Sequence, residues 1–113
     1  MTADTDTTSS DTTDQFSLVH VPEESTFEIR DGDNAAGTAH YVQGESSRTF
    51  DHTVVLPEYG GQGLAAKLVR FALDNTVADG QRITPVCSYV QAFVRKNHEY
   101  DEHVDWPEGV AAE

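Results

Sequence analysis

The sequence predicts a single domain of the mixed α/β (α+β) class, in which an antiparallel meander of strands precedes a helix, one further strand and a second helix. Three observations lead to this prediction. The chain has 113 residues, which is long enough for one continuous hydrophobic core but not for two. Its first half contains short runs that alternate between apolar and polar residues, as half-buried strands do. From residue 61 onward, apolar residues recur with the period of about 3.6 that is typical of an amphipathic helix.

The meander is predicted from segments that lie between turn sequences. Residues 16–21 alternate weakly before a proline, which makes them a candidate first strand. Residues 26–30 and 37–42 flank the turn sequence at 31–34 and predict a β-hairpin. Residues 48–56 are rich in β-branched and aromatic side chains, and a proline follows them. We expect this last strand to be the central one of the sheet.

The second half of the chain predicts a helix, a strand and a helix. The first helix should run to about Asp79, with these apolar residues on one face: Leu64, Ala65, Leu68, Val69, Phe71 and Ala72. A right-handed crossover would then place residues 81–87 as a strand parallel to residues 52–56. A second helix is expected over 89–96, followed by a turn that packs Tyr100, Val104 and Trp106.

The two ends of the chain differ in composition from its middle. Residues 1–15 are mainly Thr, Ser and Asp with almost nothing to bury, so ordering them would cost backbone entropy without compensation. We therefore expect a disordered acidic tail over 1–15 and one folded domain over 16–113.

The charge balance excludes one class of function. Twenty acidic residues against seven basic ones give a formal net charge of -13, which repels a phosphate backbone, and no basic cluster offsets it. A nucleic-acid partner is therefore not expected. With only Lys67 and Lys96 as lysines, the composition is typical of adaptation to high salt, because molar salt shortens the Debye length to about 3 Å. An ordinary acidic protein is the alternative.

Cysteine usage and hydropathy indicate the compartment. The single cysteine, Cys87, excludes an intramolecular disulfide and fits a reducing environment. No run approaches the roughly eighteen apolar residues that a membrane span needs, and the N-terminus has no basic or apolar segment of a secretion signal. We expect a cytoplasmic protein without a membrane partner, and the sequence leaves its oligomeric state open.

A glycine-rich loop, GGQGLA at residues 60–65, opens the first predicted helix. Unpaired N–H groups and the positive end of the helix dipole meet at such a point, and glycines let a phosphate approach the backbone. A tight turn would use the same glycines, so the loop alone leaves both interpretations open. The P-loop motif is disfavoured because Leu64 follows Gly63, where that motif has lysine. The dinucleotide-binding fingerprint is disfavoured because it follows the first strand of a parallel sheet, whereas this loop follows an antiparallel meander.

Four segments together resemble the GNAT superfamily of N-acetyltransferases. They are His52-Thr53, PEYGGQGLAAKLV at 57–69, PVCSYV at 85–90 and RKNHEY at 95–100. The coenzyme A loop of that superfamily reads Gln/Arg-x-x-Gly-x-Gly/Ala, and only Gly60 departs from it. The resemblance is to the small single-domain branch and covers roughly residues 27–104. It implies a GNAT-like fold in which the strand ending at Cys87 splays from the central strand to open a V-shaped slot.

The resemblance also implies acetyl-CoA as the cofactor and assigns it a set of residues. The pantetheine arm would lie along the central strand, the phosphates on the glycine-rich loop, and the adenosine end near the second helix. The implied cofactor-binding residues are Val54, Val55, Leu56, Gly60, Gly61, Gln62, Gly63, Leu64, Ala65, Lys96 and Asn97. Without the side chain that the family carries at the position of Gly60, one contact to the cofactor would be missing.

Two side chains are candidates for catalysis. Cys87 would lie beside the cofactor sulfur, either as a transient acyl acceptor or as a neighbour of the departing thiolate. His52 could accept the proton of an attacking amine, and a backbone N–H near Leu56 could stabilise the oxyanion. The ordinary alternatives are a small buried hydrophobe for Cys87 and a strand histidine bonded to the backbone for His52.

Other polar residues are better explained by structure. Glu58 could act as a base through a water molecule, but a solvated carboxylate in a loop is the better interpretation. Tyr89 and Tyr100 could donate a proton to the leaving thiolate, but packing in the core is the better interpretation of each. His98 and His103 are five residues apart, which does not place both on one helical face, so we assign no metal.

The predicted function is N-acetyl transfer from acetyl-CoA to an amine, for which the acidic surface weakly favours a cationic acceptor such as a polyamine or a lysine-bearing peptide. The alternative is a non-catalytic module that binds coenzyme A or an acyl-coenzyme A and reports it to a partner. The short chain favours this alternative, because it leaves little surface for a second substrate.

Overall fold

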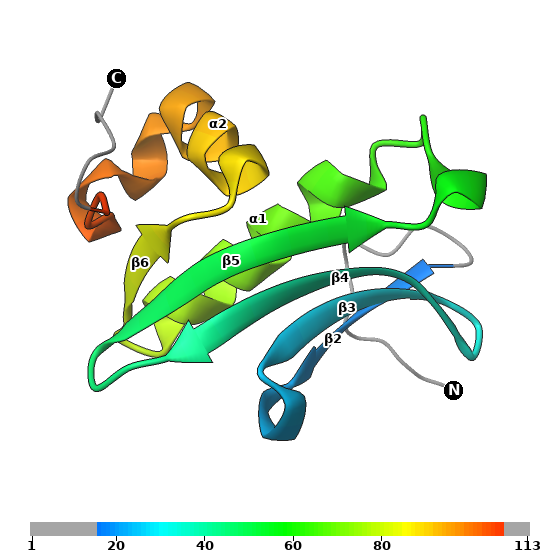
Figure 1. The fold of residues 1–113 in the computed structure, drawn as a ribbon, viewed down its shortest axis with the longest axis horizontal. Helices are drawn as coiled ribbons and strands as arrows, with labels where there is room; N and C mark the ends of the chain where they lie inside the picture. The colour runs from blue at the N-terminus through cyan, green and yellow to red at the C-terminus, as the bar shows by residue number, and fades with distance from the viewer. Residues whose placement is uncertain (1–15, 108–113) are drawn as a thin grey trace.

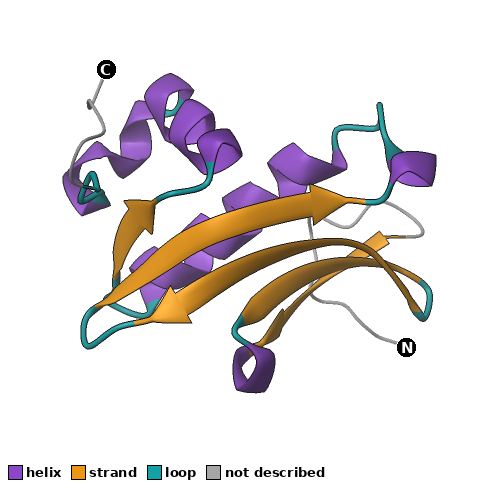
Figure 2. Cartoon of the chain, viewed as in Figure 1, coloured by secondary structure: helices purple, strands orange, loops and turns teal. Residues whose placement is uncertain are grey.

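The computed structural model describes residues 16–107 and shows one mixed five-stranded sheet with helices packed against it (Figures 1 and 2). The predicted tail over 1–15 lies outside the described residues. The strand order is β2-β3-β4-β5-β6, antiparallel from β2 to β5 and parallel between β5 and β6. The strands are β2 (Phe16–Val21), β3 (Thr26–Asp31), β4 (Asn34–Gln43), β5 (Ser47–Val55) and β6 (Arg82–Pro85).

Helices cover one face of this sheet. The long helix α1 (Leu64–Ala78) contacts all five strands, and α2 (Ser88–Lys96) contacts β5, β6 and α1. Three short 3-10 segments complete the described chain: η2 (Pro22–Glu24), η3 (Pro57–Tyr59) and η4 (His98–His103). The predicted fold class, both helices and every predicted strand are therefore confirmed.

The inward face of α1 differs slightly from the predicted one. Leu64, Leu68, Val69 and Ala72 are buried as expected, but Ala65 and Phe71 are only half-buried, and Leu73 and Thr76 take the central places instead. Phe71 still meets the core, where its ring lies edge-on to Phe27. The largest fully buried side chains come from both layers and include Phe27, Phe50, Ile29, Leu68, Leu73 and Ile83.

The parallel strand β6 pairs with a different part of β5 than predicted. It lies beside Ser47–Phe50 and not beside residues 52–56. Pro85 ends β6 and has no N–H to continue the ladder, while the carbonyl of Phe50 accepts the N–H groups of Val86 at 3.0 Å and Cys87 at 2.8 Å. The two strands part after Phe50, and Figure 1 shows β5 continuing beside β4 but without β6 beyond that point.

A β-bulge at Asp51 changes which side chains of β5 face the core. Tyr41 lies opposite Phe50 and His40 lies opposite His52, so Asp51 is an extra residue in β5. Before the bulge, even-numbered side chains such as Phe50 point inward. After it, the order is reversed, and Val54 is 53% exposed although it is apolar. The bulge therefore turns His52 and Val54 toward the open face of the sheet.

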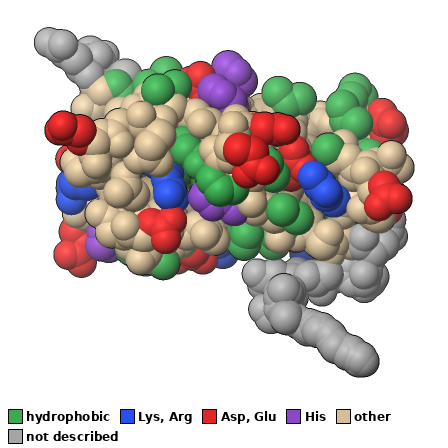
Figure 3. All heavy atoms as spheres, turned by 90° about the horizontal axis from the view of Figure 1, so that it is seen from below, with side chains coloured by type: hydrophobic (Ala, Val, Ile, Leu, Met, Phe, Trp, Pro, Cys, Tyr) green, Lys and Arg blue, Asp and Glu red, His purple; other side chains and the backbone are tan. Residues whose placement is uncertain are grey.

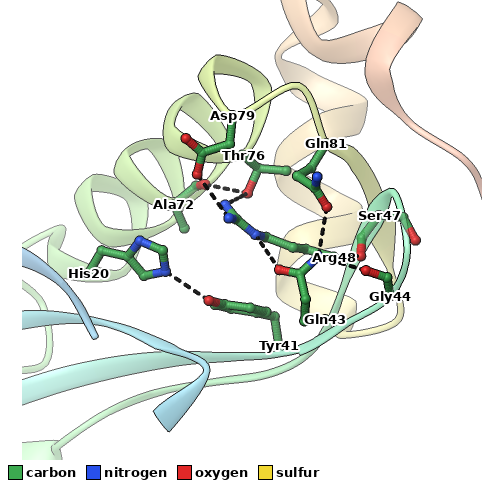
Figure 4. Close-up of polar contacts among 10 residues, drawn as sticks. All are labelled: His20, Tyr41, Gln43, Gly44, Ser47, Arg48, Ala72, Thr76, Asp79 and Gln81. Atoms are coloured by element: carbon green, nitrogen blue, oxygen red, sulfur yellow. Dashed lines mark hydrogen bonds and ion pairs between the residues drawn. The ribbon is translucent and has the colours of Figure 1, made fainter. Parts of the chain in front are cut away.

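A buried arginine ties the C-terminal end of α1 to the paired part of β5 (Figure 4). Arg48 is 7% exposed, and its guanidinium donates to Asp79 at 2.9 Å, Gln43 at 3.0 Å and Thr76 at 3.4 Å. It also lies 5.2 Å from the ring centre of Tyr41. Hydrogen bonds to a charged group contribute about 1.5–3 kcal/mol each. This network therefore holds the paired end of β5 against the C-terminal end of α1.

Among the charged residues of the described chain, acidic residues outnumber basic ones. On the face shown in Figure 3 they are scattered between hydrophobic and other side chains and do not form one patch. None of the helices over residues 16–107 has the length and apolar character needed to cross a bilayer.

Candidate active site

Cys87 lies at the point where β6 parts from β5. Cys87 precedes the first residue of α2 and is half-buried, and its Sγ lies 3.6 Å from the hydroxyl of Thr53 on β5. The side-chain amide of Gln91 donates to the carbonyls of Pro85 at 3.0 Å and Val86 at 3.2 Å, which fixes the turn from β6 into α2. The thiol therefore lies on the helix-covered side of the sheet, beside the edge of β5 that β6 leaves unpaired beyond Phe50, which is the place expected for the slot.

The backbone groups of β5 that face this slot follow from its pairing with β4. The N–H of Leu56 donates to the carbonyl of Ala36 at 2.9 Å, so it points toward β4 and is already engaged. Because backbone groups alternate along a strand, the N–H of Val54 points the same way, whereas those of Thr53 and Val55 point into the slot. The backbone N–H groups of this part of β5 that do not point toward β4 are therefore those of Thr53 and Val55, and not that of Leu56.

The glycine-rich loop leads into α1 with open space in front of it. Gly61 and Gly63 adopt positive φ angles of 80° and 73°, which residues with a side chain rarely adopt, and no atom lies within 4 Å of the place where a Cβ would be. Gly63 is the N-cap residue of α1, no side chain caps this end, and the first turn has no acidic residue. Its N–H groups can therefore bind an anion.

The loop is fixed to the sheet by Tyr59. The phenol donates to the Asp31 carboxylate at the end of β3, at 2.8 Å, and this hydrogen bond raises the pKa of Tyr59 above its ordinary value. Gly60 has a φ of -65°, which any residue adopts, but a Cβ at this position would lie only 3.3 Å from the backbone oxygen of Pro57.

A cavity of about 500 Å³ lies between α1 and α2 and gathers positive charge. Both lysines of the chain, Lys67 and Lys96, line it together with Arg70. The other lining residues are Ala66, Tyr89, Ala92, Phe93 and Asn97. Sequence reasoning identified Lys96 and Asn97 but missed Lys67 and Arg70, which face α2 only because the two helices pack together. Three cations at one cavity are notable in a chain with a net charge of -13.

The side chain of Asn97 is used to position Arg70. Its amide donates to the carbonyl of Phe93 at 2.8 Å, and its oxygen accepts from Arg70 at 3.0 Å. Arg70 also donates to Glu99 at 2.7 Å, and this bond lowers the pKa of Glu99. Burial and a 2.6 Å hydrogen bond to Asp74 raise the pKa of Tyr100, so that residue packs in the core as expected.

His52 belongs to a cluster that the sequence did not reveal. We call His40, Asp51 and His52 the bulge triad. The bulge places the consecutive residues Asp51 and His52 on the same face of the sheet as His40, which is the partner of His52 on β4. Asp51 accepts from His40 Nδ1 at 2.7 Å and lies 3.8 Å from His52 Nδ1. The two imidazole rings stack at 5.2 Å with an angle of 14° between their planes.

The electrostatics of the bulge triad favour an ionised Asp51. Partial burial alone would raise the pKa of Asp51, but the hydrogen bond from His40 and the nearby His52 bring it below the ordinary value. The side chain of His52 is 65% exposed. It lies on the open face, whereas the neighbouring Thr53 reaches Cys87 on the helix side. His52 and Cys87 therefore flank the slot from opposite faces of the sheet.

Comparison with known proteins identifies the family and the fold. Residues 26–104 match the GCN5-related N-acetyl-transferase family. The chain is similar to Protein NATD1 of Bos taurus, at 37% identity over 65 residues, which cover 58% of this chain and 57% of that protein. The match thus spans little more than half the length of that relative. The solution structure of a GCN5-like protein from Staphylococcus aureus has a TM-score of 0.64 and 24% identity, covers 86% of this chain and 95% of its own, and shows the same fold.

Proposed function

Because the chain belongs to the GCN5-related N-acetyltransferase family, we propose that it transfers an acetyl group from acetyl-CoA to a primary amine. The observation that supports this most strongly is that α1 carries two features suited to anions in a chain of net charge -13. Its N-terminal end at Gly63 has no side-chain cap, and its next turns place Lys67 and Arg70 at the cavity that Lys96 also lines.

The residues present fit a coenzyme A molecule. The N–H groups from Gly61 to Ala65 would hold its pyrophosphate, since the space before Gly61 and Gly63 is open. Lys67, Arg70 and Lys96 would bind the phosphates of its adenosine end. These cations and N–H groups stabilise negative charge in a protein that otherwise repels it.

The free edge of β5 would align the acyl arm. The N–H groups of Thr53 and Val55 would donate to it, while Val54 and Leu56 hold the strand to β4 and contribute packing. When bound, acetyl-CoA supplies a thioester as the acyl donor. A donor N–H facing the slot would then stabilise the negative charge that develops on the carbonyl oxygen.

The acceptor would enter from the open face, on the side of the bulge triad. Its nitrogen would attack the thioester carbonyl carbon as the carbon–sulfur bond breaks, and the thiolate released would lie on the side of Cys87. The proton from the amine would pass to His52, whose Nδ1 lies 3.8 Å from the Asp51 carboxylate that accepts a hydrogen bond from His40. With donor and acceptor on opposite faces of the sheet, the reaction needs no covalent intermediate on the protein.

We predict that acetyl-CoA alone leaves no acetyl group on Cys87. The thiol donates to the hydroxyl of Thr53, which is not a base, and His52 lies on the other face. Cys87→Ala should therefore lower turnover by no more than about tenfold, or about 1.4 kcal/mol of barrier. Intact-protein mass after incubation with acetyl-CoA measures the first expectation. A stoichiometric acetyl adduct on Cys87 that amines then discharge would contradict direct transfer.

A further inference from the structure

The bulge triad has the composition and spacing of a metal-binding site. Its three possible ligand atoms, one from each residue, all lie within 4.8 Å of one another. Bonds of about 2.0–2.2 Å from zinc to histidine nitrogen or carboxylate oxygen place two ligands of one ion roughly 3–3.5 Å apart. The observed separations of 2.7 Å between His40 and Asp51 and 3.8 Å between Asp51 and His52 are close to this spacing.

The sheet holds these three side chains on a rigid base. His40 and His52 are direct partners across an antiparallel pair of strands, and the bulge adds Asp51 to the same face. Both histidines direct Nδ1 toward the same carboxylate, and each approaches a different one of its oxygens. The two rings are stacked at an angle of 14°, so an ion could bind both Nδ1 atoms, in place of their contacts with the carboxylate, after at least one ring turns toward the other.

We propose that the bulge triad binds a divalent transition metal of the zinc class. His40 Nδ1, His52 Nδ1 and a carboxylate oxygen of Asp51 would be its ligands, and water would complete the coordination on the exposed side. Two imidazoles and one carboxylate suit Zn²⁺, Co²⁺ and Ni²⁺ better than Mg²⁺ or Ca²⁺, which prefer oxygen ligands alone. The net charge of -13 attracts cations to the surface.

Metal binding would also oppose catalysis. A nitrogen that binds the ion must lose its proton, so binding releases protons and weakens as the pH falls. An ion on His52 Nδ1 leaves the other ring nitrogen protonated and removes the acceptor for the amine proton. This inhibition rests on the proposed function, whereas the metal site itself does not.

Titration of the full chain with Zn²⁺, in the absence of acetyl-CoA, tests the site by calorimetry. We expect one equivalent of Zn²⁺ to bind saturably. His40→Gln and Asp51→Asn should each lower the affinity for Zn²⁺ by about tenfold to a hundredfold. Titration with Co²⁺ should produce visible absorption that the same two variants lose. Circular dichroism of each variant confirms that the fold is retained, as expected for partly exposed side chains.

The matched control is His98→Gln, which removes an exposed histidine that also contacts a carboxylate, Asp101, at 3.1 Å but has no third ligand in the described chain. This variant should bind Zn²⁺ like the original protein. The proposal is overturned if Zn²⁺ does not bind saturably, or if His98→Gln weakens binding as much as the triad variants do. Because the measurement is made without substrate, its failure would leave the acetyl-transfer proposal unaffected.

Discussion

Replacing Gly63 with aspartate should abolish the stabilisation of the fold by coenzyme A, which we expect to reach about 2.7 kcal/mol at a hundredfold excess over Kd. Gly63 is the N-cap residue of α1, and no atom lies within 4 Å of the position of a Cβ. The new carboxylate would occupy the space proposed for the phosphates, repel them and cap the N–H groups itself. Thermal unfolding with and without coenzyme A measures the difference.

The opposite end of the same helix provides the control. Gly80 has the same φ of 73° and the same open surroundings, so Gly80→Asp adds an equal charge and a similar backbone strain. Both variants should lose some intrinsic stability, but only Gly80→Asp should still be stabilised by coenzyme A. If coenzyme A stabilises the two variants equally, the phosphates bind elsewhere.

A second large effect is expected from His52→Gln, which should reduce acetyl transfer by at least about a hundredfold. Glutamine keeps a polar side chain on the open face but cannot accept the proton of the amine. Because His52 points away from the helix-covered side, the variant should still be stabilised by coenzyme A as strongly as the original protein. Initial rates at saturating acetyl-CoA measure the loss.

Two further variants make this result specific. His40→Gln should cause a smaller loss, since His40 orients Asp51 but need not touch the acceptor. His98→Gln, in an exposed His–Asp pair in η4, should leave the rate unchanged. An undiminished rate in His52→Gln would show that another group takes the proton, and Glu58 in η3 would be the next residue to test.

Most of the fold could be predicted because its signals are local. The helix α1 has an apolar stripe and glycines before and after it, and the strands lie between recognisable turns. The bulge could not be predicted. Val54 and Val55 are both apolar, so the sequence does not show which one faces the core. In the structure Val55 packs against the core, whereas Val54 is 53% exposed. For the same reason, the sequence did not show on which face of the sheet His52 lies.

Some parts of the candidate site could likewise be predicted from the sequence, and others could not. The glycine-rich loop and Cys87 belong to continuous motifs, so the sequence located them directly. The cationic cavity depends on the packing of α1 against α2, which brings Lys67 and Arg70 near residues almost thirty positions later in the chain. The bulge triad depends on the register between β4 and β5, which no run of neighbouring residues specifies.

The most direct test of the proposed activity is the release of free thiol from acetyl-CoA by the purified protein, with and without a primary amine. A polyamine and a lysine-bearing peptide are suitable acceptors, because the acidic surface attracts cations. We predict that thiol release requires both the protein and an amine, and that one acetylated amine forms for each thiol released. If acetyl-CoA stabilises the protein but neither amine increases thiol release above the level of His52→Gln, the chain binds the cofactor without transferring its acetyl group.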